Sequence, residues 1–217
     1  MCFSATASFI AGISLAALGV ATVKKAERKA EIPFAMIPLL FGIQQIIEGM
    51  LWLSFRFDAK LLNVTMTYMF TLFSHVLWPI FVPLSIGLVE TTAWRKKAIA
   101  VFLFIGMAVG LYLLYLIVKF PVASKINGHI VYISPHFYKV PTMALYLAAT
   151  CVACFFSSHK QVNIFGILAL LLFMVAYWFY TAAFFSVWCF FAAILSVVIY
   201  LYFKSGKARA PDLRHRA

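Results

Sequence analysis

The feature that most constrains this chain is a series of long apolar segments separated by short basic connections. A helix of about twenty apolar residues crosses the roughly 30 Å hydrocarbon core of a bilayer. Of the 217 residues, 65% are hydrophobic and 11% are charged, too few charges to cover a water-facing surface. An all-α integral membrane protein is therefore predicted. Its apolar segments are Phe3–Val23, Ile32–Phe55, Thr65–Val89, Ala98–Phe120, Thr142–Ser157 and Ile164–Phe203.

The last apolar segment is twice as long as a bilayer accepts, so it must fold back on itself. The predicted break lies at Phe184–Ser186, where Ser186 is a suitable helix-capping residue. This break makes a bundle of seven transmembrane helices. Within the third segment, Pro79 and Pro83 predict a kink just inward of His75.

The distribution of Lys and Arg predicts the orientation of the bundle. Most of them fall in alternate connections and in the tail, and the side richer in basic residues is normally cytoplasmic. The N-terminus is thus expected outside and the C-terminus in the cytoplasm, with the chain in the inner membrane. Residues 1–203 form the transmembrane domain and 204–217 a basic cytoplasmic tail. Membrane lipids are expected partners, whereas nucleic acid is not, since no basic stripe carries interleaved aromatic residues.

The longest connection, residues 121–140, is expected outside and carries a hairpin pattern. Asn127-Gly128 lies between Val122–Ile126 and His129–Ile133, a combination that favours a type I′ turn. A short β-hairpin is therefore predicted to cover the outer face of the bundle.

Two ionisable residues lie well inside predicted spans, Glu48 in the second and His75 in the third. Gln44 and Trp52 share a helical face with Glu48 because they are four residues from it. Helix rise places Glu48 about 10 Å and His75 about 15 Å below the outer end. Consecutive antiparallel helices are usually neighbours, so a Glu–His contact is expected.

Other polar residues fall at the same outer level, which predicts an outward-facing polar pocket in the bundle. Ionisable groups inside a membrane are functional candidates by default, although an internally satisfied network that fixes helix register is the alternative. The pocket is expected to bind a small or lipid-like ligand, in a sensory role. Its predicted lining is Glu48, His75, Gln44, Gln45, Ser4, Trp52, Tyr68, Thr71, Tyr177 and Trp188.

Two other functions fit the same residues. A zinc-dependent hydrolase acting on a lipid needs about three ligands, and His75, Glu48, Cys2 and Cys189 are the candidate donors. The span count and orientation resemble the ceramidase and progestin-receptor superfamily, but its paired histidines are missing from the last helix. Proton-coupled transport of a small solute is the third hypothesis, with Glu48 and His75 as relay. The internal repeats typical of transporters are absent from the sequence.

The opening Met1–Ser8, MCFSATAS, resembles the start of a group of small bacterial membrane proteins. Residues 38–52, with Gln44-Gln45, Glu48-Gly49 and Trp52, are similar to the same group, as is His75 followed by Trp78-Pro79. The similarity covers the whole chain. It implies a bacterial source and a single seven-span unit, and it brings no assigned activity.

Overall fold

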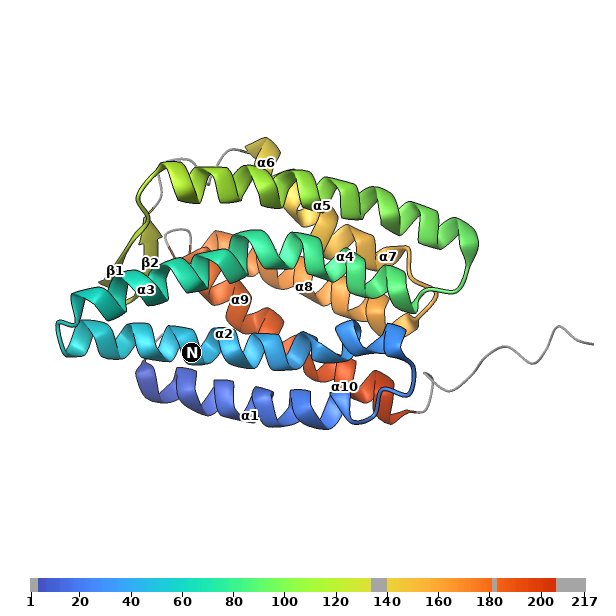
Figure 1. Cartoon of the computed structure of the whole chain (residues 1–217), viewed down its shortest axis with the longest axis horizontal. Helices are drawn as coiled ribbons and strands as arrows, with labels where there is room; N and C mark the ends of the chain where they lie inside the picture. The colour runs from blue at the N-terminus through green and yellow to red at the C-terminus, as the bar shows by residue number, and fades with distance from the viewer. Residues whose placement is uncertain (1–3, 134–139, 181–182, 206–217) are drawn as a thin grey trace, which may run out of the picture.

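The computed structural model describes residues 4–133, 140–180 and 183–205, and of Phe185 the backbone alone. In this part of the chain, seven helices lie roughly parallel or antiparallel in one bundle (Figure 1). A two-stranded hairpin lies between the fourth and the fifth of these helices along the chain. In the view of Figure 1, α1 and α5 run along opposite edges. The continuous helices are α1 (Ala5–Val23), α2 (Ile32–Arg56, after the 3₁₀ turn Lys29–Glu31), α5 (Ala93–Lys119) and α8 (Lys160–Phe179).

The other three helices are interrupted. A π-helical segment, Leu72–Leu77, joins α3 (Lys60–Thr71) to α4 (Trp78–Val89). A second π-helical segment, Ala148–Val152, joins α6 (Val140–Leu147) to α7 (Ala153–Phe155). The last helix consists of α9 (Phe184–Leu195) and α10 (Val197–Lys204), which meet at Ser196.

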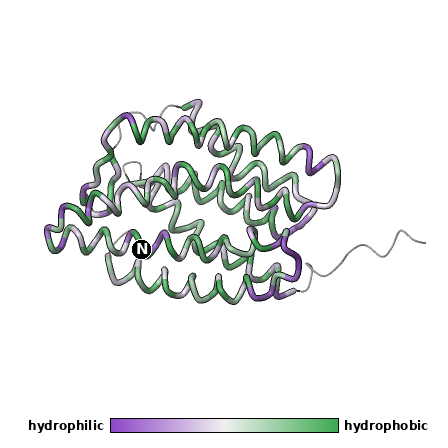
Figure 2. The backbone as a smooth tube through the Cα atoms, viewed as in Figure 1, coloured by the Kyte–Doolittle hydropathy of each residue, from purple (hydrophilic) through white to green (hydrophobic). Residues whose placement is uncertain are grey.

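In the described residues, 6 of the helices are long and apolar enough to cross a membrane. The seventh, Val140–Phe155, is apolar but shorter than the about 20 residues a bilayer core requires. Hydrophilic residues gather at the two ends of the bundle, and the lengths of the helices between them are mainly hydrophobic (Figure 2). The chain is therefore a multi-pass membrane protein.

Glycine residues set the closest helix contacts. A Cβ built on Gly19 of α1 would lie 2.4 Å from the backbone nitrogen of Leu39 in α2. A Cβ on Gly106 of α5 would lie 1.8 Å from the carbonyl oxygen of Pro79 in α4. Neither distance is possible for real atoms, so only glycine permits these two backbone contacts.

The break before the last helix lies slightly earlier than predicted. Helix α8 ends at Phe179 and α9 begins at Phe184, with Ala183 in the N-cap position. The predicted capping role of Ser186 is therefore wrong. Its hydroxyl instead donates a hydrogen bond to Oε1 of Glu48.

At the place where Pro79 and Pro83 predict a kink, the helix has a π-helical segment that contains His75 and ends two residues before Pro79. The kink itself stays a prediction. Proline has no backbone N–H and cannot bond the carbonyl four residues earlier, so the α-helical pattern is broken at this point. Single π-helical turns of this kind are frequent at functional sites.

The hairpin is present as β1 (Ala123–Asn127) and β2 (His129–Ile133), paired antiparallel with Ile126 opposite Ile130. Asn127 pairs with His129, so Gly128 alone forms the turn, with φ of +68°. A type I′ turn needs positive φ at two residues, and Asn127 does not have it. The predicted hairpin is confirmed, but its predicted turn type is wrong.

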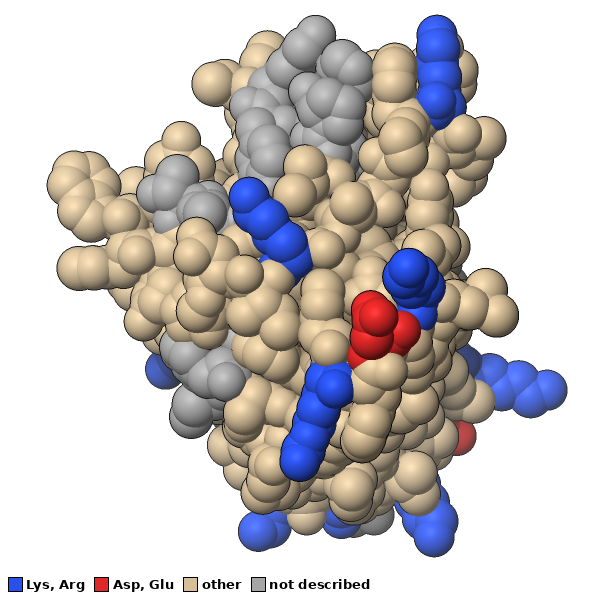
Figure 3. All heavy atoms as spheres, turned by 90° about the vertical axis from the view of Figure 1, so that its left-hand side faces the viewer, with Lys and Arg blue, Asp and Glu red and all other residues tan. Residues whose placement is uncertain are grey.

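The hairpin packs onto one end of the bundle. Ile130 and Tyr132 of β2 are buried against Leu51 of α2 and Phe70 of α3. The rings of Tyr132 and Phe70 are stacked with centroids 4.4 Å apart. Seen end-on, this end of the molecule is mostly uncharged surface with scattered basic side chains (Figure 3).

Two charged residues tie the opposite end together. The buried Glu90 carboxylate, at the end of α4, accepts hydrogen bonds from the backbone nitrogen of Thr92 (2.9 Å) and the hydroxyl of Ser158 (3.0 Å). Arg95 donates to the carbonyls of Phe156 (3.2 Å) and Ser157 (3.0 Å). These bonds join the α4–α5 turn to the loop between α7 and α8.

Candidate functional site

Helix α2 carries the polar face around which the candidate site is built. Gln44, Gln45 and Glu48 are all 0% exposed, and Trp52 lies one turn beyond Glu48 and is partly buried. Residues three and four apart share one helical face, so these side chains form a continuous stripe. The sequence prediction that this stripe points into the bundle is confirmed by its burial.

Glu48 has a hydrogen-bond donor from a distant part of the chain. Ser186, in the first turn of α9, donates its hydroxyl proton to Oε1 of Glu48, and Ser186 is itself 1% exposed. A buried carboxyl group is costly without such partners. The bond therefore fixes α9 against the middle of α2.

Gln44 is held by an indole. Nε1 of Trp78, at the start of α4, donates to Oε1 of Gln44 at 2.7 Å. The indole also stacks on Phe41, which lies one turn before Gln44 on α2, with ring centroids 3.9 Å apart. Helices α2 and α4 are thus joined by one polar and one aromatic contact.

His75 lies on the π-helical segment and is 1% exposed. Its Nδ1 lies 2.7 Å from the hydroxyl oxygen of the neighbouring Ser74. The hydroxyl of Tyr146, in α6, donates to the backbone carbonyl of Ser74. Tyr146 therefore fixes the short helix Val140–Phe155 beside His75.

Cys189 lies one turn along α9 from Ser186. It connects the polar residues around Glu48 with those around His75, which together form the polar cluster. Its thiol lies beside the side chain of Gln44 and close enough to Glu48 to interact electrostatically. It has a similar interaction with the hydroxyl of Tyr146. The Glu48 side and the His75 side of the bundle therefore meet at Cys189, on α9.

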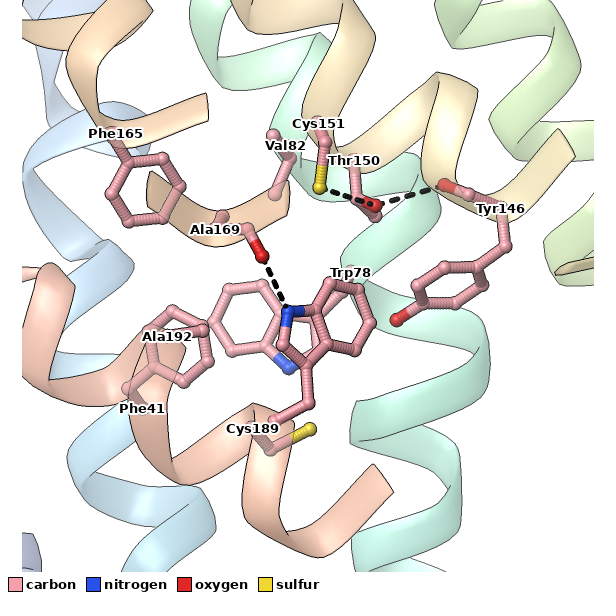
Figure 4. Close-up of a pocket in the computed structure, with 11 residues that line it drawn as sticks. Phe41, Trp78, Val82, Tyr146, Thr150, Cys151, Phe165, Ala169, Cys189 and Ala192 are labelled. Atoms are coloured by element: carbon pink, nitrogen blue, oxygen red, sulfur yellow. Dashed lines mark hydrogen bonds between the residues drawn. The ribbon is translucent and has the colours of Figure 1, made fainter. Parts of the chain in front are cut away.

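A small cavity of about 30 Å³ lies next to this cluster (Figure 4). Its wall is almost entirely apolar, and the indole Nε1 of Trp188 donates to the carbonyl of Ala169, another lining residue, at 2.9 Å. A cavity of this size accommodates a water molecule or a group of similar size. It is lined by Phe41, Trp78, Val82, Tyr146, Thr150, Cys151, Phe165, Ala169, Trp188, Cys189 and Ala192.

Two side chains on the α2 stripe, Gln45 and Trp52, make no side-chain hydrogen bond to any described residue. Among the described residues, neither Nε2 nor Oε1 of Gln45 has a hydrogen-bond partner. Nε1 of Trp52, seven residues further along α2, also has none. Seven residues complete about two turns, so both groups project from the same side of the helix.

The remaining predicted pocket residues have hydrogen bonds or ring contacts of their own. Ser4 accepts a hydrogen bond from the backbone nitrogen of Ala7 (3.3 Å) and caps α1, and Thr71 donates to the carbonyl of Thr67 (2.7 Å). The hydroxyl of Tyr68 accepts from the backbone nitrogen of Val122 at 3.4 Å, next to the hairpin.

Tyr177 is 49% exposed and stacks on Phe173 with ring centroids 5.8 Å apart. Trp188 lies in the wall of the cavity. Ligand binding by these five residues, Ser4, Tyr68, Thr71, Tyr177 and Trp188, stays a prediction.

The predicted metal donors are only partly placed. Within residues 4–133, 140–180 and 183–205, no three His, Cys, Asp or Glu side chains are grouped so as to hold a metal ion. Cys2, one of the four predicted donors, lies outside the described residues. A zinc site made of His75, Glu48, Cys2 and Cys189 therefore stays a prediction.

Sequence reasoning missed Tyr146, which supports His75 through the backbone of Ser74. Tyr146 is one of several tyrosines in the apolar segments, and nothing in its spacing distinguishes it. Its contact depends on α6 lying beside the π-helical segment, which is a property of the folded bundle.

Comparison with known proteins agrees with the resemblance carried by the opening MCFSATAS. Residues 1–216 match the family model described as a family of unknown function, DUF6629. No curated protein and no solved structure matches the chain. Because the match spans nearly the entire sequence, the chain belongs to the DUF6629 family.

Proposed function

We propose that this protein binds a small or lipid-like ligand at the polar cluster of Gln45, Glu48 and His75, in a sensory role. In this proposal the N-terminus and the hairpin lie outside the inner membrane and the basic tail lies in the cytoplasm. The positive-inside distribution of Lys and Arg supports this orientation.

One observation carries the proposal, the amide of Gln45. It is 0% exposed, and its donor and its acceptor both lack partners among the described residues. Leaving one buried polar group unsatisfied costs about 1–3 kcal/mol. A side chain that only fixed helix packing would not need an amide at this position, since leucine has a similar size and no such cost.

The chemistry of the cluster limits the ligand. Gln45 offers a donor and an acceptor together, and Trp52 offers a second donor on the same side of α2. A carboxylic acid, an amide or an alcohol supplies the matching pair of groups. The apolar cavity beside Cys189 would receive only a small part of such a molecule, because its volume is about 30 Å³.

Access to the cluster requires movement of the hairpin. Ile130 and Tyr132 of β2 are 0% and 4% exposed and pack with Ile47, Leu51 and Cys189 at the hairpin end of the cluster. A two-stranded hairpin is only marginally stable by itself. We therefore infer that it opens to admit the ligand and closes over it.

Native mass spectrometry of protein extracted in a mild detergent tests the proposal. The wild type is expected to retain a small molecule that Gln45→Leu and Glu48→Gln lose. Ser85→Ala is the matched control. Within the described residues, the hydroxyl of buried Ser85 bonds only the carbonyl of Val82 in its own helix, so the substitution should leave binding unchanged. If wild type and Gln45→Leu have the same retained mass, the ligand proposal is wrong. Stoichiometric zinc lost in His75→Ala and Glu48→Ala would instead favour the hydrolase.

A further inference from the structure

A groove of about 180 Å³ runs between α4 and α5 on the surface of the bundle. Leu84 and Leu88 on its α4 side are 37% and 40% exposed, so the groove opens toward the bilayer. It uses none of the residues of the polar cluster. Its lining is Pro83, Leu84, Gly87 and Leu88 from α4 and Lys96, Ile99, Ala100 and Leu103 from α5.

The shape of the groove follows from two glycines. At Gly106 the backbones of α4 and α5 touch, because a Cβ there would clash with the carbonyl oxygen of Pro79. Toward the end of α4, Gly87 has no side chain to fill the space between the helices. A Cβ built on Gly87 would meet only Cγ2 of Ile99, at 3.4 Å, which is an ordinary contact distance.

The groove has a basic group at one end. Lys96 is exposed in the first turn of α5, and its side chain makes no hydrogen bond or ion pair with any described residue. Two charged residues near it in the sequence have other partners, because Arg95 bonds two carbonyls and the acidic Glu90 accepts hydrogen bonds from the loop after α7. The ammonium group of Lys96 is therefore available to an external anion.

The position of Lys96 along the helix matches a lipid headgroup. Its neighbour Trp94 is 58% exposed, and exposed tryptophans near helix ends are typical of the membrane interface. From Lys96 to Leu103 the α5 wall of the groove extends about 10 Å toward the bilayer centre and is entirely apolar. An acyl chain fits the apolar part, and a phosphate fits the basic end.

We propose that the α4–α5 groove binds one anionic glycerophospholipid, with an acyl chain against Gly87 and Ile99 and the headgroup phosphate at Lys96. This site is separate from the proposed ligand cluster and does not depend on it. A lysine near an anionic headgroup contributes about 1 kcal/mol, so Lys96 should account for about a five-fold difference in affinity.

The test titrates phosphatidylglycerol or phosphatidylcholine of identical acyl chains into the purified, delipidated protein and counts bound lipid by native mass spectrometry. One phosphatidylglycerol should bind more tightly than phosphatidylcholine. Lys96→Gln should weaken phosphatidylglycerol binding about five-fold. Gly87→Leu should abolish binding of both lipids, because the leucine side chain fills the groove.

Lys97→Gln is the matched control, since Lys97 is an exposed neighbour that does not line the groove. The proposal is overturned if Lys97→Gln weakens binding as much as Lys96→Gln, if the two lipids bind equally, or if Gly87→Leu still binds lipid like the wild type. Lys96 is exposed and its substitution should not affect folding, so this variant decides the question even if Gly87→Leu is unstable.

Discussion

Ser186 donates a hydrogen bond to the buried carboxyl of Glu48 across a sequence separation of 138 residues. This contact joins the second and the last helices of the bundle at a point where neither side chain reaches water. Cys189 lies one turn further on α9 and beside Gln44, so the same part of α9 contacts two polar residues of α2.

Removing either partner of this bond should destabilise the fold in a coupled way. Ser186→Ala leaves Glu48 without this donor and should lower the free energy of unfolding by about 1–3 kcal/mol. In a Glu48→Gln background, Ser186→Ala should lower the free energy of unfolding by less than it does in the wild type, because the bond between the two side chains is already altered. Thermal unfolding in detergent micelles measures both effects. Strictly additive losses would show that the bond contributes nothing.

The Trp78–Gln44 bond gives a second test. Gln44→Met keeps the side-chain length but leaves the indole N–H of Trp78 without its acceptor, so a loss of about 1–3 kcal/mol is expected. Adding Trp78→Phe removes the unsatisfied donor and should restore part of the loss. Trp178→Phe is the control, since Trp178 is 81% exposed and should have little effect. An equal loss in Gln44→Met and Trp178→Phe, or no recovery when Trp78→Phe is added to Gln44→Met, would contradict this account.

Glu90 predicts how stability depends on pH. Burial raises the pKa of its carboxyl, but hydrogen bonds from Ser158 and Thr92 outweigh burial and hold the pKa below its ordinary value of 4.5. The charged form is thus favoured by folding, so its contribution is complete above 4.5 and is lost as the pH falls through the folded-state pKa.

Glu90→Gln should therefore lower the unfolding temperature at neutral pH and make it less sensitive to acidification below 4.5. Hydrogen bonds to a charged group contribute about 1.5–3 kcal/mol, which sets the scale of the neutral-pH loss. Glu27→Gln, at an exposed position near the same end of the bundle, should leave the pH profile unchanged. An unaltered profile in Glu90→Gln would show that its carboxylate does not stabilise the fold.

Gly106 should be intolerant of even one methyl group. Gly106→Ala places a Cβ in the space held by the carbonyl of Pro79, so α4 and α5 must separate at a cost of about 1–3 kcal/mol. Gly87→Ala on the same helix pair meets only an ordinary contact and should be nearly neutral. Thermal unfolding of the two variants gives the comparison, and equal stability of both would refute the close contact.

Much of the architecture was predictable because it depends on local hydrophobicity. Segment length and apolar composition predicted the helices, and Asn127-Gly128 predicted the hairpin. Burial of Glu48 and His75 followed from their position inside apolar segments. These properties need no knowledge of which helices are neighbours.

The partners of those residues were not predictable in the same way. The spacing of Gln44 and Trp78 defines their helical faces, but not that one bonds the other. Ser186 has a suitable residue type for a cap, yet its hydroxyl bonds a carboxyl on a helix more than a hundred residues earlier. Such contacts depend on the packing of the complete bundle, and so does the cavity beside Cys189.

The central claim is that the Gln45 amide is retained for a bound ligand, and the unfolding temperature of Gln45→Leu tests it most directly. Wild type and variant are compared in nanodiscs prepared from the native membrane and again after exhaustive detergent exchange. If a ligand occupies the cluster, the variant is less stable than wild type in the native membrane. After exchange it is more stable by about 1–3 kcal/mol, because the unsatisfied amide is gone. A stability difference of the same sign and size in both preparations would contradict the account.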